Sequence, residues 1–173
     1  MEMMDVVNEQ DEIINTVSQP EIYEKKLTHR IVHVFVLNPE NGKIYLQKRS
    51  DMKSYLPGYY CTSAGGHVRS GESYEEAAKR ELQEEIGLTT QLEKIGSMNF
   101  ILNEQNRFID LFVTYANEGF NFTDGEVAGG RFFGVLEVDT LIKSGKKIHP
   151  QLEHCYNWIK ENKPELLKHE KMV

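Results

Sequence analysis

The sequence contains few cysteines and no long apolar segment. Its two cysteines, Cys61 and Cys155, lie far apart and neither belongs to a C-x-x-C pair, which argues against a disulfide framework and against a zinc site. The longest apolar runs, at 31–37 and 108–116, are much shorter than the ~20 residues that a membrane-spanning helix needs. No basic residue precedes Lys25, so the N-terminus lacks the charged start of a signal peptide. We therefore expect a soluble, cytoplasmic protein with no membrane partner.

Basic side chains are scarce relative to acidic ones. The chain has 20 Lys and Arg against 27 Asp and Glu, which gives a formal net charge of −7. Because nucleic-acid polymers and anionic lipids are bound through basic surfaces, we expect neither as a partner. A length of 173 residues suits one compact domain. We assign residues 29–168 to the main domain and residues 1–28, with two short strands and a short helix, to an N-terminal part of the same domain.

Apolar periodicity predicts strands and helices in a mixed order. Helices are expected at 72–86, 138–143 and 150–167, with Gly87 capping the first of them. Strands are expected at 31–37, 43–49, 59–63, 92–102 and 107–116, and residues 131–133 are expected to open a further strand. Because the two kinds of element do not strictly alternate, we expect an α/β fold with a mixed sheet and helices on both of its faces.

The helix expected at 72–86 carries carboxylates on its apolar side. On a helical wheel this side holds Leu82 and Ile86. Glu81 and Glu85 fall inside the same arc, and Glu84 lies at its margin. Carboxylates that face a core are costly unless they are paired, protonated or coordinated, and Mg²⁺ or Mn²⁺ would offset their charge through oxygen ligands. The alternative is an acidic helix end that is simply solvated.

These carboxylates belong to a longer motif. Residues 66–88 read GHVRSGESYEEAAKRELQEEIGL, which fits the pattern G-x5-E-x7-R-E-U-x-E-E-x-G-U at every fixed position, where U is a bulky aliphatic residue. This pattern is the Nudix box, so the chain resembles the Nudix hydrolase superfamily. The flanking residues 29–30, 46–49, 57–59 and 63–67 are similar to the branch that includes isopentenyl-diphosphate isomerase.

The resemblance implies a fold and an activity. The fold is a Nudix-type α/β/α sandwich in which the motif forms a loop–helix–loop metal site. The activity is hydrolysis by water of a nucleoside diphosphate linked to another moiety, or of a related organic diphosphate, with Mg²⁺ or Mn²⁺ as cofactor. The partner is then a small-molecule diphosphate substrate, and a homodimer is one expected assembly because many members pair. Many organic diphosphates share the reacting group, so the sequence does not specify one substrate.

The resemblance also assigns individual motif residues. Gly66 would give a backbone carbonyl to the metal or only permit a tight turn, and Gly65 is expected among the ligand-binding residues. Arg80 and Glu72 are expected to pair and to hold the loop against the helix. His67 stands at a variable position and is expected to be a core or loop residue. Metal coordination and catalysis are assigned to Glu81, Glu84 and Glu85.

Three candidates lie outside the motif. A carboxylate near the metal can take a proton from the attacking water, and the candidates are Glu81 and Glu126, the latter from the loop before residue 131. A solvated loop residue is the alternative for Glu126. Arg49 and Lys53 precede the Pro-Gly pair at 57–58 and are candidates for phosphate contacts, with an ordinary surface position as the alternative.

Two other functions compete with hydrolysis. Isomerisation of isopentenyl diphosphate needs an acid–base pair across the double bond, and that family carries a cysteine just ahead of its Gly-His segment. Here residues 63–67 read SAGGH, and the nearest thiol, Cys61, is out of register. A module that only binds nucleotides is expected to lose motif carboxylates, and none is missing. Hydrolysis is therefore the favoured function.

Overall fold

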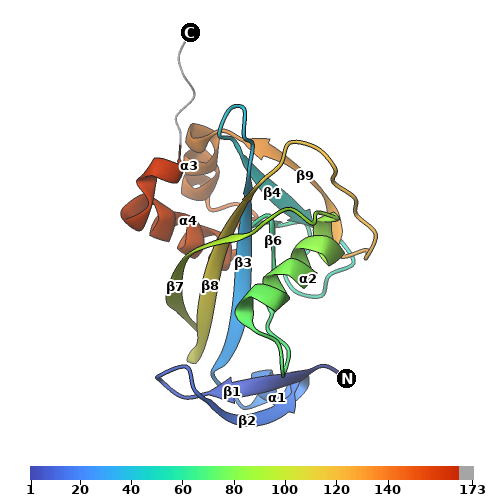
Figure 1. Ribbon diagram of the computed structural model, residues 1–173, viewed down its shortest axis with the longest axis vertical. Helices are drawn as coiled ribbons and strands as arrows, with labels where there is room; N and C mark the ends of the chain where they lie inside the picture. The colour runs from blue at the N-terminus through green and yellow to red at the C-terminus, as the bar shows by residue number, and fades with distance from the viewer. Residues whose placement is uncertain (168–173) are drawn as a thin grey trace.

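A seven-stranded mixed sheet lies between two helical layers in the computed structural model, which describes residues 1–167 (Figure 1). At its centre β3 (His29–Leu37) and β8 (Gln105–Tyr115) run parallel. The other strands pair in the antiparallel direction. Strands β4 (Ile44–Arg49) and β6 (Ala64–His67) pair with β3, and β7 (Glu93–Leu102) pairs with β8. Strands β5 (Tyr60–Cys61) and β9 (Val127–Phe133) pair with β4. The predicted mixed sheet is confirmed.

Strand β3 is buried on both faces, which explains its nearly continuous apolar sequence. Val32 and Val34 belong to the core against α2 (Tyr74–Ile86). Phe35 and Leu37 belong to the core against α3 (Val135–Ser144) and α4 (Pro150–Asn162). Figure 1 shows α2 on one side of the sheet and α3 with α4 on the other. The expected α/β/α sandwich is confirmed.

Helix α2 begins two residues later than expected. Ser73 is its N-cap: the Ser73 hydroxyl accepts from the Glu76 backbone N–H, and the Glu76 carboxylate accepts from the Ser73 N–H. This reciprocal pair leaves Glu72 outside the helix. Gly87 caps the other end in the left-handed conformation with φ of 76°, as predicted.

The helices after the sheet also differ from their expected bounds. The single helix predicted at 150–167 is wrong: α4 ends at Asn162, and Pro164–Leu166 forms a separate 3-10 turn. Pro164 has no backbone N–H, so it cannot continue the helix. Helix α3 begins at Val135 rather than 138, because Gly134 donates its N–H to the Glu137 carboxylate and starts the helix there. None of the helices within residues 1–167 is long and apolar enough to cross a membrane.

Two predicted strands were placed inaccurately. The strand expected at 59–63 is only Tyr60–Cys61, and a second strand, β6, follows at once. Ser63 separates them, because its hydroxyl accepts from the Val36 N–H and donates to the Tyr45 carbonyl. Residues 131–133 close β9 instead of opening it. The glycine-rich residues are part of strand β9. A Cβ at Gly130 would lie 2.5 Å from the Leu46 carbonyl oxygen, so the close approach of the neighbouring strand β4 accounts for a glycine there.

The N-terminal segment forms the predicted two strands and short helix: β1 (Met3–Val7), β2 (Ile13–Ser18) and α1 (Gln19–Glu24). They make a separate two-stranded sheet over a small apolar cluster that includes Met4 and Ile22. The Ser70 N–H donates to the Met3 carbonyl at 2.9 Å and joins β1 to the loop before α2. The assignment of 1–28 and 29–168 to one domain stays a prediction, and residue 168 lies outside the described residues.

Candidate functional site

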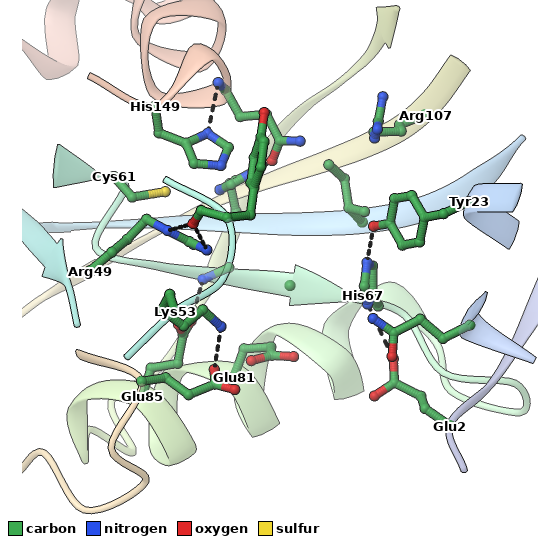
Figure 2. A pocket seen from close by; sticks show the side chains of 18 of the residues that line it. Glu2, Tyr23, Arg49, Lys53, Cys61, His67, Glu81, Glu85, Arg107 and His149 are labelled. Atoms are coloured by element: carbon green, nitrogen blue, oxygen red, sulfur yellow. Dashed lines mark hydrogen bonds and ion pairs between the residues drawn. The ribbon is translucent and has the colours of Figure 1, made fainter. Parts of the chain in front are cut away.

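A cavity of about 880 Å³ lies between α2, the N-terminal segment and the loop after β4. Figure 2 shows its two contrasting ends. The acidic end is lined by Arg49, Lys53, Glu81, Glu84, Glu85, Asp124 and Glu126. The arginine end is lined by Glu2, Tyr23, Lys26, His67, Arg69 and Arg107. All the charged candidates predicted from the sequence therefore meet at one end of a single cavity.

Helix α2 turns two of its three motif carboxylates inward. Glu85 is only 6% exposed and lies among the buried residues of the helix, beside Ile86. The side chain of Glu81 is 12% exposed, whereas that of Glu84 is 40% exposed. The helical wheel predicted this order, with Glu84 at the margin of the apolar arc.

Glu85 is held by two neutral donors. The Gly65 backbone N–H donates to Glu85 Oε1 at 2.7 Å, and Gln47 Nε2 donates to Oε2 at 3.2 Å. Burial raises the pKa of Glu85 to about 8, and repulsion from Glu81 acts in the same direction. Within residues 1–167 no Lys or Arg forms an ion pair with Glu85. The acidic end therefore contains a buried carboxylate without a cation.

Arg80 organises the start of the motif. Its Nε and Nη2 donate to the Glu72 carboxylate at 2.8 and 3.1 Å, which confirms the predicted pair. Nη2 also donates to the His67 carbonyl, and Nη1 donates to Glu81 at 2.8 Å and Glu84 at 3.3 Å. Burial nevertheless raises the pKa of Glu81 to about 7, against the opposing effect of Arg80.

The three motif carboxylates do not converge on one point. In residues 1–167 no group of three or more His, Cys, Asp or Glu side chains lies close enough together to hold a metal ion. An ion at the predicted site would have to compete with Arg80 for Glu81 and Glu84. The chemistry of the donors still fits Mg²⁺ or Mn²⁺, because the groups are oxygen ligands whose mutual repulsion a hard cation would offset.

Gly66 provides the space that Glu81 occupies. A Cβ at Gly66 would lie 2.3 Å from Glu81 Oε1, far inside contact distance. Gly66 lies within β6 and does not have a positive φ, so close approach accounts for this glycine rather than a turn. At Gly65 a Cβ would meet His33 Nδ1 at 2.5 Å and the Val32 carbonyl oxygen at 2.8 Å. Both glycines therefore bring the strand close to its neighbours.

The candidates outside the motif reach the same end. Arg49 donates from Nε and Nη2 to the Tyr55 carbonyl at 3.1 and 2.9 Å, which fixes the plane of its guanidinium. Lys53 Nζ lies 3.4 Å from Glu126 Oε2. The Glu126 carbonyl accepts from the Ser50 N–H and joins the two loops. The structure thus brings Glu126 beside a predicted phosphate contact.

The arginine end contains residues that the sequence did not place at the site. His67 Nε2 is hydrogen-bonded to the Tyr23 hydroxyl, and His67 Nδ1 lies 3.2 Å from Glu2 Oε1. His67 was expected to be a core or loop residue, but it ends strand β6 and lines the cavity. Its position directly after Gly66 was the available signal. Arg107 stands at the beginning of β8, where no local pattern marks it.

The cavity wall also includes two buried histidines. Burial lowers the pKa of His33 to about 4 and that of His149 to about 3, so both are neutral at pH 7. His149 Nδ1 accepts from the Gln151 N–H at 3.1 Å and caps α4. The Tyr55 ring packs edge-on against His149 with centroids 5.8 Å apart.

The family model for the NUDIX domain matches residues 27–155, which is most of the chain. The chain belongs to the Nudix family. A protein named an uncharacterized Nudix hydrolase from Nostoc sp. is 43% identical over 89 residues, 51% of this chain and 52% of the relative. Another, from Clostridium acetobutylicum, is 29% identical over 155 residues, 82% and 73% of the two chains.

A solved structure shares the fold of this chain. The crystal structure of DR0079 from Deinococcus radiodurans matches with a TM-score of 0.80 and 24% identity, over 94% of this chain and 99% of that one. At this identity the likeness shows the fold alone. The chain spans about half the length of the first curated Nudix relatives.

Proposed function

We propose that this Nudix protein hydrolyses a phosphoanhydride bond of a small organic diphosphate at the acidic end of the cavity. One observation carries the proposal: Glu85 and Glu81 are carboxylates turned into an open cavity, and Glu85 has only neutral donors among the described residues. Buried negative charge of this kind is costly unless a cation compensates it. A diphosphate that arrives with a divalent cation supplies that compensation.

The residues that would hold the cation are Glu81, Glu84 and Glu85, with the Gly66 carbonyl as the predicted fourth donor. When bound, Mg²⁺ or Mn²⁺ offsets the negative charge of the diphosphate, which otherwise repels a nucleophile. The small size of Gly66 supports this set, because it lets the strand approach the Glu81 carboxylate.

Other residues of the acidic end would orient the substrate and move the proton. Arg49, already fixed by the Tyr55 carbonyl, presents a planar guanidinium that suits phosphate oxygens. Lys53 adds a second positive charge. Glu81 and Glu126 are the two candidates to accept the proton of the attacking water. A Glu126→Gln variant that keeps full turnover would assign that step to Glu81.

A diphosphate panel tests the proposal. The protein would be incubated with a nucleotide sugar, a dinucleoside polyphosphate and an isoprenoid diphosphate, each with Mg²⁺ or Mn²⁺, and followed by ³¹P NMR. We expect release of phosphate or of a monophosphate that stops when a chelator removes the metal. Turnover at the full rate in excess chelator, or intact substrates throughout the panel, would contradict the proposal.

The same panel separates the two competing functions. An isomerase would rearrange an allylic diphosphate without releasing phosphate, but Cys61 is buried, and burial raises the pKa of its thiol to about 11. A binding module would retain a diphosphate in a metal-dependent way without turnover. The homodimer and the cytoplasmic location stay predictions.

A further inference from the structure

The arginine end of the cavity has an excess of positive charge. Lys26, Arg69 and Arg107 line it together with one carboxylate, that of Glu2. Figure 2 shows Arg107, Tyr23, His67 and Glu2 grouped away from Arg49 and Glu85. The positive charge at this end is therefore separate from the groups that we assign to the phosphoanhydride.

Arg107 differs from the other two cations of this end. Lys26 lies 3.4 Å from a Glu104 oxygen and Arg69 lies 3.4 Å from a Glu2 oxygen, so each has a carboxylate neighbour. Arg107 is 8% exposed, and within residues 1–167 no carboxylate forms an ion pair with it. A buried guanidinium without a counter-ion is costly, and an anionic ligand would remove that cost.

The guanidinium of Arg107 is held in place by Gln105. Gln105 Nε2 donates to the carbonyls of Ile22 and Leu27, both at 3.0 Å, which uses both of its N–H groups. Its Oε1 is therefore turned to Arg107 Nη2 at 3.3 Å, while Arg107 Nη1 donates to the Gln105 carbonyl at 3.2 Å. These are two of the five guanidinium N–H groups, and the acceptors are neutral. The Phe100 ring centroid lies 5.9 Å from the guanidinium carbon. Within residues 1–167 the other guanidinium N–H groups make no hydrogen bond, so they are available to a ligand in the cavity that Arg107 lines.

We propose that Arg107 binds a second anionic group, a phosphate or a carboxylate, that the substrate carries at a distance from the bond to be hydrolysed. This inference rests on the proposed function and names its substrate class: an organic diphosphate with a remote anion. A cavity of about 880 Å³ is large enough for a dinucleotide-sized ligand that reaches both ends. The planar fork of an arginine suits two oxygens of one phosphate or carboxylate.

Inorganic phosphate tests the Arg107 site without any catalysis. The protein in excess chelator is titrated with phosphate by calorimetry, in the wild type, Arg107→Gln, Arg107→Lys, the control Arg69→Gln at the same end, and Arg49→Gln, which reports any phosphate bound at the acidic end. We expect Arg107→Gln to weaken binding at least tenfold, Arg107→Lys to restore part of it, and Arg69→Gln to change it less than threefold. Equal binding by Arg107→Gln, loss of binding only in Arg49→Gln, or no binding by the wild type would overturn the site.

A measurement on the wild type covers the case in which Arg107→Gln does not fold. The side-chain resonances of protein labelled with ¹⁵N-arginine would be followed during the phosphate titration. A shift of the Arg107 resonance supports the site, and shifts confined to other arginines contradict it.

The substrate class is tested with matched pairs that differ by one phosphate remote from the diphosphate: NADPH against NADH, and coenzyme A against dephospho-coenzyme A. We expect kcat/KM to be at least tenfold higher for the phosphorylated member, mainly through KM, and the difference to vanish in Arg107→Gln. Equal values for both members would overturn this inference and leave the hydrolase standing. Absence of hydrolysis of every diphosphate would overturn the proposed function, while the phosphate titration would still decide whether Arg107 binds an anion.

Discussion

The two ends of the cavity are built in opposite ways. At the acidic end, Glu81 and Glu85 come from one turn of α2 and are held by Arg80 of the same motif and by Gly65 directly before it. At the arginine end, Gln105 joins Arg107 to the Ile22 carbonyl, 83 residues away in the sequence from Gln105. The motif carboxylates are therefore held mainly by one helix and its preceding loop, with one further donor from Gln47, whereas the arginine end exists only after the N-terminal segment has packed. This difference suggests that chemistry and substrate selection are separable in this protein.

The largest effect is expected from Glu85→Gln, which tests whether the acidic end carries the chemistry. The amide keeps an acceptor for the Gly65 N–H but removes the charge, so we expect turnover to fall by about 10²–10³-fold. Thermal stability measured in chelator should change little, because loss of the buried carboxylate is opposed by a new contact between the amide N–H groups and the Gln47 Nε2 donor. Glu75→Gln, on the exposed face of the same helix, is the matched control and should keep its activity. Full turnover in Glu85→Gln would remove the acidic end from the mechanism.

A smaller loss is expected from Gly66→Ala. The new methyl group would displace the Glu81 carboxylate, and a misplaced catalytic group costs on the order of 10–10²-fold in rate. Stability should change little because the displaced atoms end a flexible side chain. Gly65→Ala makes the informative comparison, since its methyl group meets the Val32 backbone and should lower the melting temperature. If both variants lose only stability, Gly66 has no part in the position of Glu81.

The buried His149 of the cavity wall leads us to expect that stability depends on pH. Its pKa is lowered by burial to about 3, while in the unfolded chain it is near 6.5. As the pH falls below 6.5, His149 takes up a proton in the unfolded chain but not yet in the folded protein. The free energy of unfolding therefore falls by about 1.4 kcal/mol for each pH unit between pH 6.5 and pH 3. His149→Asn keeps a capping side chain that does not titrate in this range.

Chemical unfolding at pH 7.5 and pH 5 tests this expectation. The wild type should lose about 2 kcal/mol more than His149→Asn between the two values. Asn157→Ala, at an exposed position of α4, serves as the control and should lose stability in parallel with the wild type. Parallel losses in His149→Asn as well would mean that His149 takes up its proton in the folded protein.

The smallest effect is expected from Tyr23→Phe at the arginine end. Removal of the hydroxyl breaks the hydrogen bond to His67, which is worth about 1 kcal/mol of unfolding free energy. Because the acidic end is untouched, kcat should change less than threefold. A fall in kcat as large as that of Glu85→Gln would show that the two ends act as one catalytic unit.

The features that the sequence predicts correctly depend on neighbours in the chain. Gly87 as the cap of α2, the Arg80–Glu72 pair and the burial of Glu85 follow from spacing along one helix and its loop. The central strand β3 is also predicted correctly, because a strand buried on both faces is apolar at almost every position.

The features that it misses are set by tertiary contacts. Strand β9 contains two consecutive glycines, which have low strand propensity, but the Tyr45 ring leaves no space for a side chain at Gly130. Arg107 resembles any other arginine at the start of a strand until Gln105 and the N-terminal segment surround it. The motif likewise does not predict that Arg80 donates hydrogen bonds to Glu81 and Glu84.

The position of Glu2 in the cavity wall has a practical consequence for handling the protein. Any sequence joined to Met1 emerges next to a residue that contacts both His67 and Arg69. A polyhistidine purification tag fused there would carry its own chelating imidazoles to the mouth of a site that we expect to need a divalent ion. Assays of metal dependence are therefore best performed on tag-free protein.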